Sequence, residues 1–145
     1  MRHLCDSNVF LALIASGHRH HRATRDWYQS LSRHDTAEFC RMTQVTFLRL
    51  LTTEAVMGAY ALTNDQAISL YGELLRHDRV SFAEPEPAGL EAAWHQFAAA
   101  HQAAPKRWMD AYLAAFARLA GMRLVTFDRR FQQYEAGGLD LLLLV

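Results

Sequence analysis

Three aspartates stand at positions where carboxylates could do chemistry together. Asp6 follows a short apolar segment at the N-terminus, and Asp128 follows another near the C-terminus. Asp110 falls in the first turn of a predicted helix, where free backbone N–H groups and the helix dipole favour an anion. Taken singly, each is most simply a cap, but carboxylates gathered at one place repel one another unless a cation neutralises them. Because Mg²⁺ and Mn²⁺ prefer oxygen ligands, the three together indicate a site for one of these ions.

The elements that must position these aspartates are short strands alternating with helices. This alternation is typical of an α/β domain with a mainly parallel sheet of four to five strands, covered by helices on both faces. In such sheets ligands bind outside the carboxyl ends of the strands, where we expect Asp6 and Asp128 to lie. The predicted strands cover residues 3–5, 38–43, 79–83, 124–127 and 139–145, and the predicted helices cover 9–14, 23–31, 45–55, 64–76, 90–101 and 108–120.

The helix that carries Asp110 has small residues on the same face. Ala114, Ala117 and Gly121 follow Asp110 at helical spacing, and Gly121 stands where a left-handed cap would end the helix. A face of small residues lets a helix approach a sheet closely. We therefore expect this helix to bring Asp110 within reach of the other two aspartates.

Composition and charge limit the class of protein. The 145 residues predict one domain over 1–145, and 15 basic against 15 acidic residues exclude a uniformly basic nucleic-acid binder. The charge is uneven, however: +3 over 1–49, −5 over 50–104 and +2 over 105–145. The chain shows no secretory signal, membrane span or cysteine framework, which favours a cytoplasmic protein.

Three segments resemble PIN domains of the VapC toxin family. They are Asp6-Ser7-Asn8-Val9, Trp108-Met109-Asp110-Ala111-Tyr112-Leu113-Ala114 and Val125-Thr126-Phe127-Asp128-Arg129-Arg130-Phe131. They occur in the family's order, and the resemblance covers nearly the whole chain. It implies a PIN-like three-layer α/β/α fold and a metal-dependent endoribonuclease that acts as the toxin of a type II toxin–antitoxin pair and inhibits translation.

The resemblance also implies roles for particular residues and partners. Asp6, Asp110 and Asp128 match the family's catalytic, metal-binding aspartates, with Mg²⁺ or Mn²⁺ as the cofactor. Ser7 or Asn8, together with Thr126, would orient these carboxylates through hydrogen bonds. The implied partners are an RNA substrate, a cognate antitoxin protein and a second copy of the chain, with DNA contacted only through the antitoxin.

One position departs from the family's pattern. PIN toxins carry a glutamate three residues before an arginine that here resembles Arg49, but this chain has Thr46 there, with Gln44 two residues earlier and Glu54 two turns further on. Thr46 or Gln44 could hold a metal-bound water. The alternative is a PIN-like protein that binds RNA or a partner with weak or no cleavage.

Basic residues near the aspartates are candidates for phosphate contacts. Arginine suits bidentate contact with phosphate, and the candidates are Lys106, Arg107, Arg129 and Arg130.

A run of histidines, His18, His20 and His21, lacks the distant partners of a zinc site, which favours substrate contact or the start of a helix. Two other phosphate-handling classes are disfavoured, since the Asp-x-Asp phosphatase pattern fails at Asn8 and no Gly-x-x-x-x-Gly-Lys loop is present.

Overall fold

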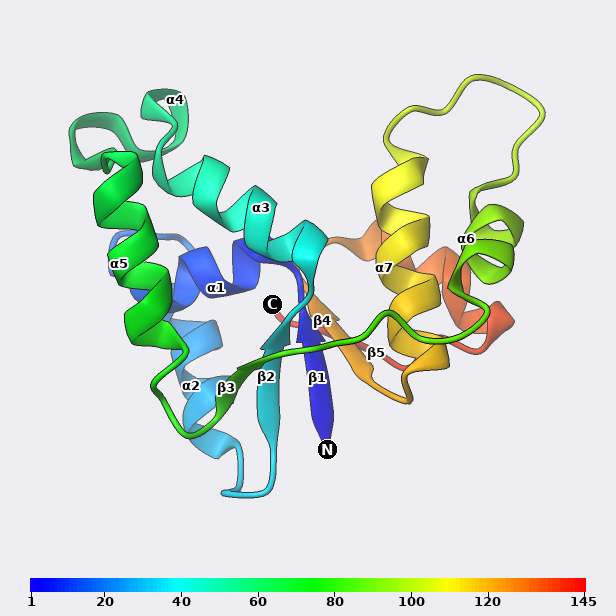
Figure 1. Ribbon diagram of the computed structural model, residues 1–145, viewed down its shortest axis with the longest axis horizontal. Helices are drawn as coiled ribbons and strands as arrows, with labels where there is room; N and C mark the ends of the chain where they lie inside the picture. Colours follow the sequence, from blue (N-terminus) through cyan, green and yellow to red (C-terminus); the bar gives the residue numbers. More distant parts are fainter.

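The computed structural model describes all 145 residues and contains one five-stranded sheet. The strand order is β3-β2-β1-β4-β5 and every pairing is parallel, which confirms the predicted α/β class (Figure 1). The strands are β1 (Arg2–Cys5), β2 (Thr36–Phe39), β3 (Val80–Phe82), β4 (Arg123–Thr126) and β5 (Leu141–Leu143).

Seven α-helices and two 3₁₀ helices connect the strands. None has the length and apolar character needed to cross a bilayer. The helices are α1 (Ser7–Ile14), α2 (His21–Ser30), α3 (Arg41–Leu51), α4 (Glu54–Met57), η1 (Gly58–Tyr60), α5 (Asn64–Leu74), α6 (Leu90–Ala98), α7 (Arg107–Leu119) and η2 (Arg129–Gly137).

The helices form a layer on each face of the sheet. Side chains alternate along the strands, so Leu4 and Leu124 pack under α6, α7 and η2, whereas Cys5 and Val125 pack under α1, α3 and α5. Figure 1 shows these two helical layers on opposite sides of the strands. The two cysteines are buried and unpaired, as expected of small apolar residues.

The second strand and the helix after it begin earlier than predicted. The prediction placed a strand over 38–43, but β2 ends at Phe39 and α3 begins at Arg41. Thr43 explains the difference, because its hydroxyl accepts a hydrogen bond from the Cys40 N–H at 2.9 Å and donates to the Cys40 carbonyl oxygen. These contacts close the first turn of α3, which begins four residues earlier than the apolar spacing suggests.

Helix α7 packs close to the sheet through small side chains. Ala111, Ala114, Ala115 and Ala117 are all completely buried, which confirms the predicted close approach. Gly121 adopts a φ of +66°, and the Met122 N–H reaches the Ala117 carbonyl oxygen at 2.8 Å. This is the hydrogen bond expected of a left-handed helix end.

The end of α7 provides a matched test of glycine conformation. No heavy atom crowds the position of an added Cβ at Gly121 or at Gly72 in α5, but only Gly121 has a positive φ. We expect Gly121→Ala to lower the free energy of unfolding by about 1 kcal/mol, through backbone strain. We expect Gly72→Ala to raise it by about 0.5–1 kcal/mol, through helix propensity. Urea denaturation measures both, and shifts in the same direction would contradict this explanation.

Candidate active site at the carboxyl edge of the sheet

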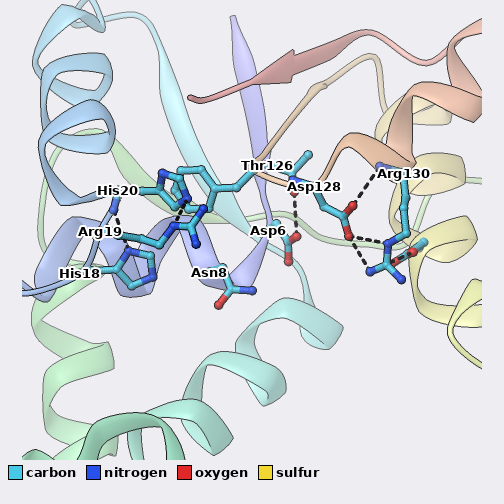
Figure 2. Close-up of a pocket in the computed structure, with 10 residues that line it drawn as sticks. Asp6, Asn8, His18, Arg19, His20, Thr126, Asp128 and Arg130 are labelled. Atoms are coloured by element: carbon cyan, nitrogen blue, oxygen red, sulfur yellow. Dashed lines mark hydrogen bonds and ion pairs between the residues drawn. The ribbon is translucent and has the colours of Figure 1, made fainter.

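A pocket of ≈ 510 Å³ opens at the carboxyl edge of the sheet, beside the ends of β1 and β4. The three predicted aspartates all line it, so side chains 104 and 122 residues apart in the sequence come together (Figure 2). The lining residues are Asp6, Asn8, His18, Arg19, His20, Asp110, Thr126, Phe127, Asp128 and Arg130.

Asp6 is held at the junction of β1 and α1. Its backbone N–H donates to the Val125 carbonyl oxygen at 2.9 Å, which extends the pairing of β1 with β4 by one residue. Its Oδ2 accepts a hydrogen bond from Thr126 Oγ1 at 2.9 Å, and the same hydroxyl oxygen accepts from the Asp128 N–H at 3.1 Å. Thr126 is completely buried, so it links the two aspartates rigidly. It therefore lies where the sequence predicted a supporting residue.

Arg130 joins the other two aspartates. Its Nε donates to Asp128 Oδ2 at 2.8 Å, its Nη2 contacts the same oxygen, and Nη2 lies 3.9 Å from Asp110 Oδ2. The Arg130 backbone N–H also donates to Asp128 Oδ1 at 2.9 Å, because Asp128 caps η2. Asp110 lies in the first turn of α7, as predicted. A single guanidinium thus bridges carboxylates from two elements.

The charges in the pocket perturb one another. Burial raises the pKa of Asp6, and the neighbouring Asp110 and Asp128 raise it further against the opposing hydrogen bond from Thr126. Burial also raises the pKa of Asp110, although Arg130 opposes it. Hydrogen bonds from Arg130 lower the pKa of Asp128. The pocket therefore concentrates negative charge, and Arg130 is the cation that balances part of it.

The chemistry of this pocket fits a hard divalent cation, although its side chains are not gathered around one. The aspartates offer only oxygen donors, which suit Mg²⁺ or Mn²⁺. As the side chains stand, no three His, Cys, Asp or Glu residues form a group that could hold a metal ion. The Arg130 guanidinium instead bridges Asp110 and Asp128, as a stand-in cation. The donor set thus fits the ion, provided that Arg130 gives way.

Two of the predicted supporting residues lie differently from expectation. The Ser7 hydroxyl donates to the Thr43 carbonyl oxygen at 2.9 Å and tethers α1 to α3, so it does not orient a carboxylate. The Thr46 hydroxyl donates to the Met42 carbonyl oxygen of its own helix, and Thr46 does not line the pocket. Asn8 does line it, on the α1 side (Figure 2).

No other residue takes the place of the missing glutamate. Gln44 accepts a hydrogen bond from Arg41 and lies outside the pocket lining. Glu38 is buried in the sheet, where it accepts hydrogen bonds from Arg2 and Thr36. Glu54 lies exposed in α4. Neither Thr46 nor Gln44 lines the pocket, so in this arrangement neither side chain is placed to hold a metal-bound water there.

The four predicted phosphate-binding residues are distributed unevenly. Arg130 lines the main pocket, and Lys106 and Arg107 line an adjoining one that shares Asp110 and Arg130 with it. Arg107 is partly engaged elsewhere, since its Nε donates to the Phe97 carbonyl oxygen at 3.1 Å. Arg129 is exposed and lines neither pocket.

The loop between α1 and α2 supplies pocket residues that the sequence left between two roles, substrate contact or the start of a helix. His18, Arg19 and His20 line the pocket, whereas the neighbouring His21 turns inward and its Nδ1 bonds the Ala12 carbonyl oxygen at 2.8 Å. Burial and the adjacent His20 and Arg19 lower the pKa of His18. The histidine run was the available signal, but its spacing alone could not show which rings face the aspartates.

Comparison with known proteins places this geometry in a family. Residues 4–137 match the profile of the PIN domain. The chain is 51% identical over 144 residues to Ribonuclease VapC41 of Mycobacterium tuberculosis, covering 97% of each protein.

Solved structures show the same fold at low sequence identity. VapBC2 of Rickettsia felis, bound to a promoter DNA fragment, matches with a TM-score of 0.71 at 13% identity over 100% of both chains. VapC20 of Mycobacterium tuberculosis, a sarcin-ricin loop cleaving toxin, matches with a TM-score of 0.63 at 18% identity over 94% of this chain and 95% of that one. From its sequence match and its fold, the chain belongs to the PIN-domain family and is a homologue of the VapC ribonucleases.

Proposed function

We propose that residues 1–145 act as a single PIN domain, a metal-dependent endoribonuclease that is the toxin of a type II toxin–antitoxin pair and inhibits translation by cutting RNA. The observation that carries this proposal is the convergence of Asp6, Asp110 and Asp128 on one pocket. The full-length similarity to Ribonuclease VapC41 supports the substrate class. Mg²⁺ or Mn²⁺ is the proposed cofactor, because the carboxylates are hard oxygen donors.

In this proposal the chain's own residues position the reaction. Asp6, Asp110 and Asp128 would hold the ion, which supplies activation of a water and neutralisation of charge on the phosphate. Thr126 keeps Asp6 and Asp128 in register through its hydroxyl. Arg130, released from the carboxylates, lies where it can donate to a phosphate oxygen of the RNA. All ten residues that line the pocket come from the positively charged first and last portions of the chain, and none comes from the acidic middle.

The proposed partners follow from the same family. Structural neighbours include VapBC complexes, one of them bound to DNA. We infer that this chain pairs with a cognate antitoxin, contacts DNA only through it, forms a homodimer and works in the cytoplasm.

A second candidate function rests on the missing acid. With Thr46 outside the pocket and no other acid in its place, the site carries three carboxylates. Fewer carboxylates bind a metal more weakly. A protein that binds RNA or a partner with little or no cleavage is therefore the alternative, and a cleavage assay separates the two.

The catalytic role of the aspartates predicts a selective loss of cleavage. We expect Asp6→Asn to reduce cleavage of total bacterial RNA in Mg²⁺ or Mn²⁺ by about 100-fold or more, because it removes a carboxylate from the ion site. Chelation with EDTA should abolish cleavage by the parent. Asp65→Asn, which changes an exposed aspartate in α5 outside the pocket, serves as the matched control and should leave the activity unchanged.

The same variants separate the nuclease from the binding protein in cells. The parent and Asp65→Asn should inhibit growth when expressed without an antitoxin, and Asp6→Asn should not. If Asp6→Asn cuts RNA and arrests growth as strongly as the parent, the pocket is not the catalytic centre. If the parent binds RNA but cuts none with either metal, the alternative function holds.

The ion pairs of Arg130 predict a change in metal affinity that can be measured without an RNA substrate. We expect Arg130→Gln to bind Mn²⁺ about fivefold more tightly, because the variant removes a competing cation whose exposed ion pair is worth about 1 kcal/mol. Electron paramagnetic resonance of free Mn²⁺ measures this affinity in the absence of RNA. Arg129→Gln is the control, since Arg129 contacts none of the three aspartates. Weaker Mn²⁺ binding by Arg130→Gln would show that Arg130 supports the site and does not compete for it.

A further inference from the structure

The loop between α1 and α2 forms the wall of the pocket that faces Arg130. Figure 2 shows His18, Arg19 and His20 on one side of Asp6, with Asp128 and Arg130 on the other. The proposed mechanism uses the aspartates and Arg130 but leaves this wall without a task. Its residues are a cation and two aromatic rings, which is the composition of a single-stranded nucleic-acid site.

The loop does not need the side chains of Arg19 and His20 to hold its shape. The His18 N–H donates to the Ala15 carbonyl oxygen and the His21 N–H to the His18 carbonyl oxygen, each at 2.9 Å. The His20 carbonyl oxygen accepts from both the N–H and the hydroxyl of Thr24. Backbone bonds and the inward-facing His21 therefore fix the loop.

The side chain of His18, in contrast, has a structural bond. Its Nδ1 accepts a hydrogen bond from the His20 N–H at 3.1 Å, so a change at His18 would disturb the loop itself. Arg19 makes one side-chain hydrogen bond, from its Nε to His20 Nε2 at 3.1 Å. Apart from this bond to each other, the side chains of Arg19 and His20 make no hydrogen bond that holds the loop.

His20 lies flat against Phe127. Their ring centroids are 4.3 Å apart and their planes differ by 16°, which is a stacked arrangement. Phe127 immediately precedes Asp128, so the stacked pair is built into the turn that carries a proposed metal ligand. An imidazole supported on a second ring offers a rigid aromatic surface, and stacking of a base on such a surface stabilises binding in any sequence context.

The charge of the pocket also requires a cation on this side. Three carboxylates at the centre repel a polyanion, and Arg130 lies on one side of them only. A strand that crosses the aspartates carries phosphates on both sides of the bond to be cut. Arg19 supplies positive charge on the side that Arg130 does not reach, and its guanidinium suits phosphate oxygens.

We propose that Arg19 and His20 form a nucleotide-binding subsite for RNA, in which His20, supported by Phe127, stacks on an unpaired base and Arg19 binds a backbone phosphate next to the bond that is cut. The subsite deepens the proposed ribonuclease function and rests on it. A base can stack in this way only when it is free of a partner strand, so the substrate is RNA with an unpaired nucleotide at the cleavage position.

Binding measured in an inactive background tests the subsite directly. The probe is a fluorescein-labelled, random-sequence single-stranded oligoribonucleotide, titrated in Mn²⁺ with Asp6→Asn protein and followed by fluorescence anisotropy. Adding Arg19→Ala should weaken binding about fivefold and reduce the slope of log affinity against log salt by about 0.7, because one phosphate contact is lost. Adding His20→Ala should weaken binding about tenfold.

Two further variants make these results specific. Arg22 has the same charge as Arg19 and lies three residues away, but it is 93% exposed and lies outside the pocket. Adding Arg22→Ala should therefore change the affinity by less than about twofold. Adding His20→Phe keeps a flat ring and should retain most of the affinity that His20→Ala loses. Thermal unfolding of each variant checks that the fold is preserved.

The outcomes distinguish failure of the subsite from failure of the function. If the Arg19→Ala and His20→Ala proteins keep the affinity and salt slope of the background while the unsubstituted parent cuts RNA, the subsite is wrong and the nuclease stands. If His20→Phe binds as weakly as His20→Ala, stacking is wrong. If neither the parent nor the background binds RNA, both proposals fall. Equal affinity for a fully base-paired RNA would overturn the requirement for an unpaired base.

Discussion

Mutual repulsion of three carboxylates is the constraint around which this site is built. Asp6 and Asp128 leave adjacent parallel strands at the same edge, and α7 brings Asp110 to them. Burial adds to the cost, since it raises the pKa of Asp6 and Asp110. Such a group persists in a folded protein only where a positive charge compensates it. In the structure that charge is Arg130, and in the proposed enzyme it is a divalent ion.

The sheet and its helices are arranged so that this edge is accessible and rigid. A parallel sheet covered on both faces leaves its carboxyl edge as the place where loops converge. Small residues let α7 pack directly on the strands, and completely buried alanines leave it little freedom to shift. Thr126 then couples two aspartates through one hydroxyl. The rigidity of the surroundings keeps like charges together that would otherwise separate.

The pocket is asymmetric in a way that suits a polyanion. Its acidic centre lies between the Arg130 guanidinium, from the last third of the chain, and the loop between α1 and α2, which supplies Arg19 and the His20 ring that stacks on Phe127. The chain as a whole is neutral, yet its positive first and last portions supply the pocket. Net charge is therefore a poor guide to this protein's ligand, because local charge at the edge of the sheet decides what binds there.

The sequence by itself determined the α/β class, the five strands and the three aspartates. Periodic apolar residues and strand-end carboxylates are local signals, and Gly121 marked the end of α7 because glycine readily adopts the positive φ of a left-handed helix end. The start of α3 was less predictable, since the Thr43 bonds that begin this helix depend on one side chain and not on a periodic pattern.

Only the tertiary structure decided which neighbours serve the site. Ser7 and Asn8 are adjacent in sequence, yet one tethers α3 and the other lines the pocket. In the same way, His20 lines the pocket whereas His21 bonds the Ala12 carbonyl oxygen. The Thr46 hydroxyl donates to the Met42 carbonyl oxygen of its own helix. These outcomes depend on contacts between residues far apart in the chain. Such contacts are fixed by packing, and no local spacing encodes them.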